Sequence, residues 1–143
     1  MTRTLLIALC CLAATAGYAQ TATPIKVTAK AIGQLEDLKE LTKAEALTSA
    51  KPNSKAHAEV RPELNRLLVI SADEFVRVAS NAPSKEGFLQ CIDTGLARVG
   101  PLAITAQDRR QVAEYFQELM EIVGLESSEG RLDTFVAQST ARQ

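Results

Sequence analysis

The feature that most constrains the fold is a helical repeat of apolar residues that lies between Thr105 and Gly124. Thr105 followed by Asp108 is a capping-box-like helix start, and Gly124 is a typical helix end. Leu125 is placed to fold back on this helix as the hydrophobic contact of a Schellman turn. The apolar residues recur at the three- and four-residue spacing of one helix face: Val112, Tyr115, Phe116, Leu119, Met120 and Val123.

The same spacing predicts two helices on the N-terminal side. A first helix is expected at about 34–48, and a polar loop follows at 49–59. A second helix starts near Pro62, which suits the first turn of a helix, and ends at Asn81-Ala82-Pro83. The apolar face of this second helix is formed by Val60, Leu64, Leu67, Leu68, Ser71, Phe75, Val78 and Ala79.

Two more helices are expected around the central repeat. Ser84 is predicted to cap one that ends at Gly100-Pro101, because Gly takes a left-handed cap and Pro cannot continue a helix. Its apolar stripe contains Phe88, Cys91, Ile92, Leu96 and Val99. A short last helix is expected to start at Ser127 or Ser128, and its inward residues are Leu132, Phe135 and Val136.

The alternating residues at 25–28 are too few and too isolated to predict a strand. The sequence therefore predicts an all-α fold, a compact bundle of four to five helices at residues 34–137. Residues 20–33 are expected to form a flexible leader, and residues 138–143 a frayed tail.

The N-terminus has the three parts of a secretory signal. Arg3 supplies the basic start, residues 5–14 form an uncharged apolar run, and small residues follow. Gly17 and Ala19 fit a cut before Gln20, and a cut after Ala16 also fits. The apolar run has only half of the about 20 residues that a membrane span needs. We therefore expect residues 1–19 to be removed as a signal peptide. The mature protein would be exported, periplasmic or secreted, without a membrane anchor.

The charge of the chain argues against a nucleic-acid partner, which would require a basic face. The chain has 16 basic and 17 acidic residues, and removal of the signal takes away one of the basic residues. Between residues 114 and 133 a single base, Arg131, stands among these acids: Glu114, Glu118, Glu121, Glu126, Glu129 and Asp133. This region is either a solvated helix face or an acidic docking surface for a basic protein.

Tyr115 lies near the edge of the apolar stripe. It either packs in the core or keeps its hydroxyl wet, as tyrosines in interfaces do. The candidate partner-binding residues are therefore Glu114, Tyr115, Glu118, Glu121, Glu126 and Glu129.

Residues that could carry chemistry are few. His57 lies in the predicted polar loop, where a surface role is expected. Cys91 is the one cysteine beyond the predicted signal, and its place on an apolar stripe predicts burial, with an intermolecular disulfide or a reactive thiol as the alternative. We expect no metal, no cofactor and no catalytic residue, because such sites need clustered ligands or a nucleophile beside a base.

Three segments carry a resemblance to a known family: Arg61-Pro62-Glu63-Leu64, Gly95-Leu96-Ala97-Arg98 and, most specifically, YFQELMEIVGLESSEG at residues 115–130. Together they resemble a bacterial family filed as domain of unknown function 4844, over roughly residues 60–136. The resemblance implies a small α-helical bacterial domain without an established activity, and it supplies no catalytic residues. A bacterial source and a signal peptide together imply the periplasm of a cell with two membranes.

Two functional hypotheses follow. The first is a non-enzymatic, exported binding protein, most concretely an immunity-type inhibitor of an antibacterial toxin that acts in the cell envelope. Its partner would be a basic toxin or envelope enzyme that docks on the acidic region. The alternative is a hydrolase that uses carboxylates such as Glu118 and Glu121 on cell-wall material.

Overall fold

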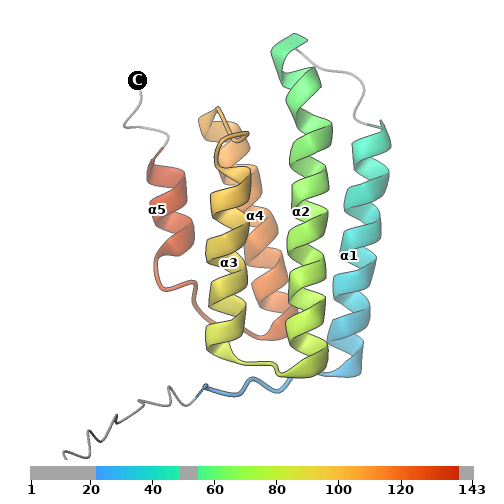
Figure 1. Cartoon of the computed structure of the whole chain (residues 1–143), viewed down its shortest axis with the longest axis vertical. Helices are drawn as coiled ribbons and strands as arrows, with labels where there is room; N and C mark the ends of the chain where they lie inside the picture. Colours follow the sequence, from blue (N-terminus) through green and yellow to red (C-terminus); the bar gives the residue numbers. More distant parts are fainter. Residues whose placement is uncertain (1–21, 49–54, 139–143) are drawn as a thin grey trace, which may run out of the picture.

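Five helices account for most of the described part of the chain, residues 22–48 and 55–138 of a computed structural model. They are α1 (Ala29–Thr48), α2 (Lys55–Asn81), α3 (Lys85–Val99), α4 (Ala106–Val123) and α5 (Arg131–Ala137). Consecutive helices run in opposite directions (Figure 1). The predicted all-α bundle is confirmed.

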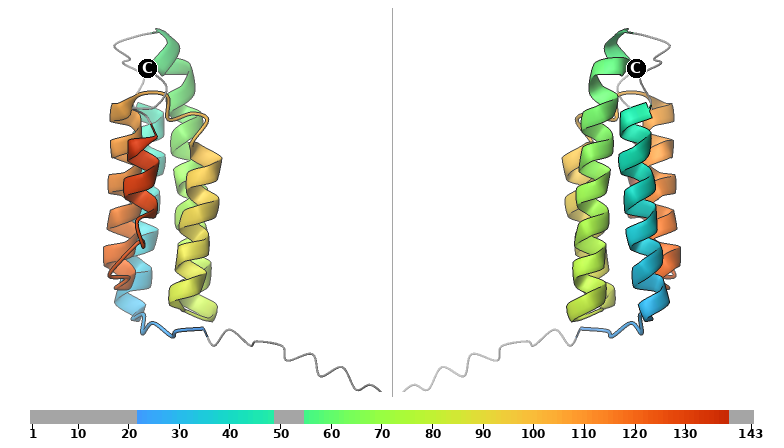
Figure 2. Two further views of the ribbon diagram at one scale, coloured as in Figure 1. Left: turned by 90° about the vertical axis from the view of Figure 1, so that its left-hand side faces the viewer. Right: turned by 90° about the vertical axis from the view of Figure 1, so that its right-hand side faces the viewer.

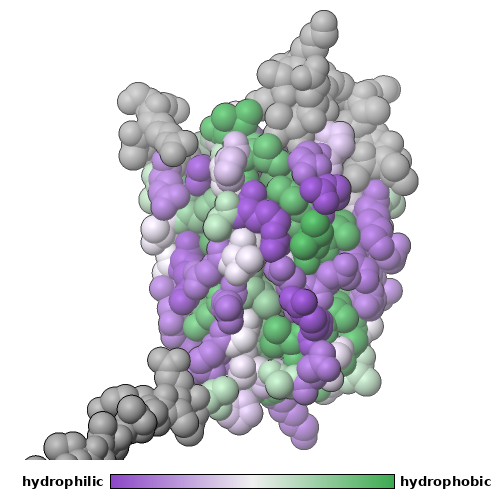
Figure 3. Space-filling model, in the orientation of Figure 1, coloured by the Kyte–Doolittle hydropathy of each residue, from purple (hydrophilic) through white to green (hydrophobic). Residues whose placement is uncertain are grey.

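The first four helices form the bundle. α1 packs against α2 and α4, and α3 also lies against α2 and α4, so the four helices enclose one core. α5 covers the outer side of the bundle, where it contacts α3 and α4 (Figure 2). Among the side chains of residues 22–45 and 61–138, only Leu41 and Ile104 are large hydrophobics that are exposed. Figure 3 shows a face on which polar residues alternate with apolar patches.

The centre of the core is a cluster of three phenylalanines. Phe75 of α2 lies 5.3 Å from Phe88 of α3 and 6.5 Å from Phe116 of α4, measured between ring centroids. All three rings are fully buried. Tilted aromatic pairs at these distances contribute about 0.5–1.5 kcal/mol each beyond the area that they bury.

α4, which the sequence predicts between Thr105 and Gly124, has the predicted structure at both of its ends. The Thr105 hydroxyl accepts a hydrogen bond from the Asp108 N–H, and the Asp108 carboxylate accepts one from the Thr105 N–H. Gly124 is left-handed, and the Leu125 N–H donates to the Met120 carbonyl at 2.9 Å. Leu125 is buried, so the predicted capping box and Schellman turn are confirmed.

The N-terminal segment differs from the prediction. α1 begins at Ala29 rather than near residue 34, and residues 22–28 are fixed against the α2–α3 turn. The Ile25 N–H donates to the Pro83 carbonyl at 3.0 Å, and the Lys85 N–H donates to the Thr23 carbonyl at 2.8 Å. Within residues 22–33 the prediction of a flexible leader is therefore wrong, because these tertiary hydrogen bonds order the chain. Residues 20 and 21 lie outside the described residues.

Three further helix ends also differ. α2 starts at Lys55, so Pro62 lies inside the helix, because residues 55–61 are mostly good helix formers. Gly100 is right-handed rather than left-handed. It has no Cβ to clash with Pro101, so it can stay helical before a proline. α5 starts at Arg131, after left-handed Gly130, and not at Ser127 or Ser128, although the Ser128 hydroxyl accepts a hydrogen bond from the Leu132 N–H at 3.5 Å.

The close packing of α3 gives a stability prediction. A Cβ on Gly95 would lie 2.8 Å from the Ser71 hydroxyl oxygen and closer still to the Phe116 ring. Gly95→Ala should therefore lower the free energy of unfolding by about 1–3 kcal/mol through overpacking. Gly33→Ala, whose Cβ would meet nothing within 4 Å in α1, should raise it by about 0.5–1 kcal/mol. Urea unfolding measures both values, and an equal effect of the two substitutions would contradict the packing argument.

Candidate functional site

Three of the acids predicted to bind a partner form one wall of a groove between α4 and α5. Glu114, Glu118 and Glu121 project from α4, and Asp133 projects from α5. All four carboxylates are exposed. The groove encloses about 540 Å³, and it is also lined by Ala113, Gln117, Leu132 and Val136. Leu132 is buried and Val136 is half-buried, so apolar surface lies among the carboxylates. We call this site the acidic groove.

The carboxylates of the acidic groove have no ion pair among the described side chains, unlike many other acids of the protein. Elsewhere in the described residues, acids such as Glu40, Glu63 and Asp93 form ion pairs with Lys or Arg. In the acidic groove the hydrogen-bond partner of Glu121 is neutral, because the Gln117 amide donates to its carboxylate at 3.1 Å. The described part of the chain shows no ion pair to Glu114 either, although Arg110 lies one turn before it. The groove therefore presents negative charge that the described side chains do not neutralise.

Two of the predicted partner-binding residues lie outside this groove. Glu126 is exposed in the turn between α4 and α5. Glu129 forms ion pairs with Lys85 at 2.6 Å and Arg131 at 3.3 Å, and these hydrogen bonds lower the pKa of its carboxyl. The structure thus separates the six predicted residues, since Glu114, Glu118 and Glu121 share one groove and Glu129 faces the start of α3.

Tyr115 packs between helices and does not project freely into solvent. It is half-buried, and its hydroxyl lies 3.3 Å from the Thr42 hydroxyl of α1, with which it forms a hydrogen bond. Its ring meets Phe116 edge-on at 6.4 Å between centroids. Of the two interpretations of Tyr115, the structure supports core packing, so it joins α4 to α1.

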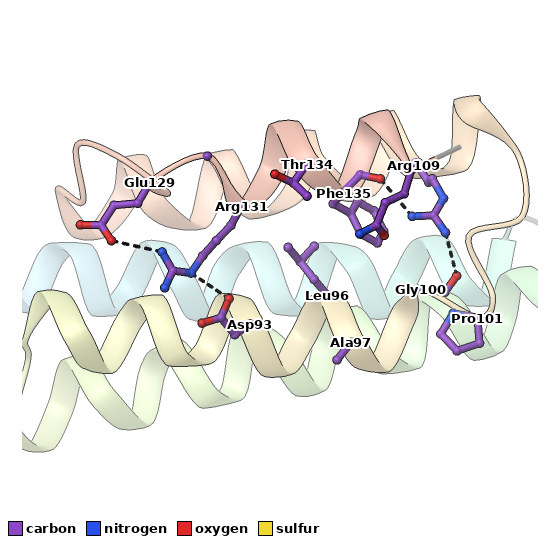
Figure 4. A pocket seen from close by; sticks show the side chains of 12 residues that line it. Asp93, Leu96, Ala97, Gly100, Pro101, Arg109, Glu129, Arg131, Thr134 and Phe135 are labelled. Atoms are coloured by element: carbon purple, nitrogen blue, oxygen red, sulfur yellow. Dashed lines mark hydrogen bonds and ion pairs between the residues drawn. The ribbon is translucent and has the colours of Figure 1, made fainter. Parts of the chain in front are cut away.

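A second groove, which the sequence did not predict, lies on the other side of α5 (Figure 4). It encloses about 810 Å³ between α3 and α5. Its walls are Asp93, Leu96, Ala97, Gly100 and Pro101 on the α3 side, Arg109 of α4, and Glu129, Gly130, Arg131, Thr134, Phe135 and Gln138 on the α5 side. We call this site the α3–α5 groove.

Arg109 is the unusual residue of the α3–α5 groove, because it is charged and only 7% exposed. Its guanidinium donates to the Phe135 carbonyl at 3.0 Å and to the Gly100 carbonyl at 3.5 Å. It also lies 4.6 Å from the centroid of the Phe135 ring, a cation–π contact. Both carbonyls belong to helix C-termini, where unpaired carbonyls and the helix dipole favour a positive charge.

The sequence contains a pattern that could have predicted the burial of Arg109. Arg109 lies three residues before Val112 and seven before Phe116, so it falls on the apolar stripe of α4. A charged residue on a buried helix face must find polar partners in the fold. The sequence alone could not show that these partners come from α3 and α5.

Cys91 and His57 are the remaining residues of the sequence that could carry chemistry, and Cys91 lines neither of the two grooves. Cys91 is a free, buried thiol, and burial raises its pKa to about 11, as expected for a packing residue. His57 lies in α2, not in a loop, because that helix starts at Lys55. Within residues 22–48 and 55–138, no group of three or more His, Cys, Asp or Glu side chains is placed to hold a metal ion.

None of the helices in the described part of the chain has the length and apolar character that a membrane crossing requires. The predicted signal peptide at residues 1–19 lies outside the described residues.

Fold and grooves define a small all-α protein in which a four-helix bundle carries a short fifth helix. The family described as "Domain of unknown function (DUF4844)" matches residues 26–140, so the chain belongs to this family. The match extends beyond both ends of the resemblance found in the sequence.

A solved structure is also similar, that of a DUF3571 family protein from Acinetobacter baumannii AYE. It shares 28% sequence identity with the chain, covers 78% of this chain and 92% of its own, and has a TM-score of 0.60. No curated protein matches the chain.

The position of Tyr115 predicts a pH effect on stability. Burial of the phenol raises its pKa from 10.0 to about 12. Because the folded state holds this proton more tightly than the unfolded chain, the contribution of Tyr115 to stability is complete below pH 10.0 and is lost as the pH rises towards 12. Urea unfolding across this interval should show a smaller loss of stability for Tyr115→Phe than for the natural chain.

A spectroscopic titration checks the same pKa directly. The chain has two tyrosines, and Tyr18 lies in the predicted signal peptide, so a variant that begins at Gln20 leaves Tyr115 as the one phenol whose ultraviolet absorbance reports ionisation. Ionisation of this variant near pH 12 is expected, and a midpoint near 10.0 would contradict the buried position.

Proposed function

We propose that this protein is a non-enzymatic binding protein of the cell envelope, and most concretely an immunity-type inhibitor of an antibacterial toxin. The observation that carries the proposal is the acidic groove, whose carboxylates have no cationic partner among the described side chains. Its partner would be a basic protein, such as a toxin or an envelope enzyme, whose Lys and Arg side chains enter the groove.

The composition of the acidic groove supports a protein partner. Buried Leu132 and half-buried Val136 lie between exposed carboxylates, which resembles the apolar centre and polar rim of a protein interface. Unpaired surface charges of one sign increase the association rate with an oppositely charged partner and exclude partners of like charge. An inhibitor benefits from both effects, because it has to reach a toxin quickly and leave other proteins free.

The alternative of a carboxylate hydrolase has less support. A general acid that is protonated near neutral pH needs buried, desolvated surroundings, whereas Glu118 and Glu121 are exposed. Glu121 accepts a hydrogen bond from Gln117, which holds its carboxylate on the helix surface. No contact in the acidic groove favours a proton transfer over ordinary ion pairing.

Charge reversal in the acidic groove tests the proposed binding. Glu118→Lys combined with Glu121→Lys should lower the association rate with the partner by at least about tenfold at low salt, because two attractive charges become repulsive. Asp37→Lys is the control, since Asp37 is an exposed acid of α1 that does not line the groove, and it is compared with each single reversal, Glu118→Lys and Glu121→Lys, which change the net charge by the same amount. The variants are compared as bait in periplasmic extract and with the product of the adjacent gene, and rates are measured at low and high salt.

A growth assay separates inhibition from binding alone. Cells that export an effector encoded next to this gene should survive when they produce the natural chain or Asp37→Lys, and should lose protection with the doubly reversed variant. Equal protection by all three chains would contradict a role for the acidic groove. Failure to capture any partner that stays bound at physiological salt would contradict the binding proposal itself.

Export is the second part of the proposal, and the apolar run at residues 5–14 supports it. In a bacterial host, the mature protein should be recovered from the periplasm with Gln20 or Gly17 as its first residue, as intact-mass measurement would show. A chain that keeps Met1 and stays in the cytoplasm would contradict export, and it would leave the acidic groove to be tested on its own.

A further inference from the structure

We infer that the α3–α5 groove is a binding site for a carboxylate-bearing ligand with an apolar part, and that Arg109 recognises the carboxylate. This site is separate from the acidic groove, and the inference is independent of the proposed function. It is carried by a buried cation, by its unused donors and by the shape of the groove around them (Figure 4).

The charge of Arg109 lacks an acidic partner among the described side chains. Its neighbours on the groove side are the carbonyl oxygens of Gly100 and Phe135, which carry only partial negative charge. The adjacent acid, Asp108, is committed to the capping box with Thr105. A guanidinium that has lost most of its water retains a strong preference for a carboxylate, with which it forms two parallel hydrogen bonds.

Arg109 also has donors left for a ligand. A guanidinium carries five N–H groups, and the two hydrogen bonds to Phe135 and Gly100 use two of them. The hydrogen bonds are made by Nη1 and Nη2, so Nε is the nitrogen that has none. In the described part of the chain, every fully buried side-chain nitrogen or oxygen has a partner, so Nε must reach the surface. The α3–α5 groove is the surface that Arg109 lines.

The rest of the groove restricts the ligand. Leu96 and Phe135 provide apolar walls beside Arg109, and the volume of about 810 Å³ lies within the range of small-molecule sites. The second arginine of the groove, Arg131, is already paired with Asp93 at 2.7 Å and with Glu129 at 3.3 Å. These two acids repel further negative charge at that end, which favours a ligand with one carboxylate and an apolar side chain.

The test uses a pair of probes that differ only in charge. N-acetyl-phenylalanine carries a carboxylate and an aromatic ring, and N-acetyl-phenylalaninamide has the same shape without the charge. Each is titrated into the ¹⁵N-labelled chain, and amide and arginine side-chain signals are followed by NMR. The acid should bind with a dissociation constant of about 0.5 mM, an ordinary ligand efficiency for a molecule of this size, and should shift the signals of Arg109, Thr134 and Phe135.

Matched variants place a competing charge in the groove without touching the core. Thr134 is exposed and lines the groove, so Thr134→Glu should weaken binding of the acid at least about tenfold more than Thr134→Gln, which adds the same bulk without the charge. Ala97→Glu and Ala97→Gln repeat the comparison from the α3 wall, in case the first glutamate disturbs α5. Circular dichroism checks that the helical content is preserved.

A tripeptide, acetyl-Ala-Ala-Phe, distinguishes the two possible sources of the carboxylate. Tighter binding of this peptide than of N-acetyl-phenylalanine assigns the site to a peptide C-terminus, and equal binding assigns it to a small carboxylate. Equal binding of the acid and its amide, shifts that map elsewhere, or no saturation by any probe would overturn the inference.

Discussion

The close approach of α3 to α2 and α4 is the constraint on which the rest of the structure depends. It occurs at Gly95, where the Phe116 ring and the Ser71 hydroxyl occupy the space that a larger side chain would need. Ser71 satisfies its own hydroxyl by donating to the Leu67 carbonyl at 3.1 Å, so a polar group can remain fully buried there. Because α3 lies this close, the rings of Phe75, Phe88 and Phe116 meet in one cluster.

The helices whose ends are encoded locally were predictable from the sequence. The capping box of α4 and its Schellman turn use residues within five positions of each other, so their chemistry is visible in the sequence. The start of α1 was not predictable from the sequence, because the segment before it is held by distant residues. Thr23 and Ile25 form hydrogen bonds with residues 83–86, which are about sixty positions away. Tertiary pairing overrides a segment with weak local preferences, and a periodicity argument contains no information about it.

For the candidate sites, too, the sequence predicted what depends on local spacing and not what depends on the tertiary fold. Glu114, Glu118 and Glu121 share one face of a helix, so their proximity follows from spacing alone. The contribution of Asp133 to the same groove required the position of α5, which no local pattern gives. Glu129 belongs to the same acidic stretch of the sequence, but it lies in the turn before α5, where its backbone is left-handed and its carboxylate pairs with Lys85 and Arg131. The three-dimensional path of a short turn therefore decided which acids remain unpaired.

α5 is the element that joins these observations. A helix of seven residues is not stable alone, so its position depends on buried Leu132 and Phe135 and on the hydrogen bond from Arg109 to the Phe135 carbonyl. The same helix separates the two grooves, with Leu132, Asp133 and Val136 on one side and Thr134 and Phe135 on the other.

Arg109 therefore couples the core to both surface sites, because it fixes the helix that forms a wall of each. A leucine at this position would continue the apolar stripe of α4, but it would leave the carbonyls of Gly100 and Phe135 without their donor. The chain keeps a charged residue where its local pattern calls for an apolar one. Such departures from local consistency are expected where a protein binds something, which is why the α3–α5 groove, and not only the acidic groove, belongs in an account of function.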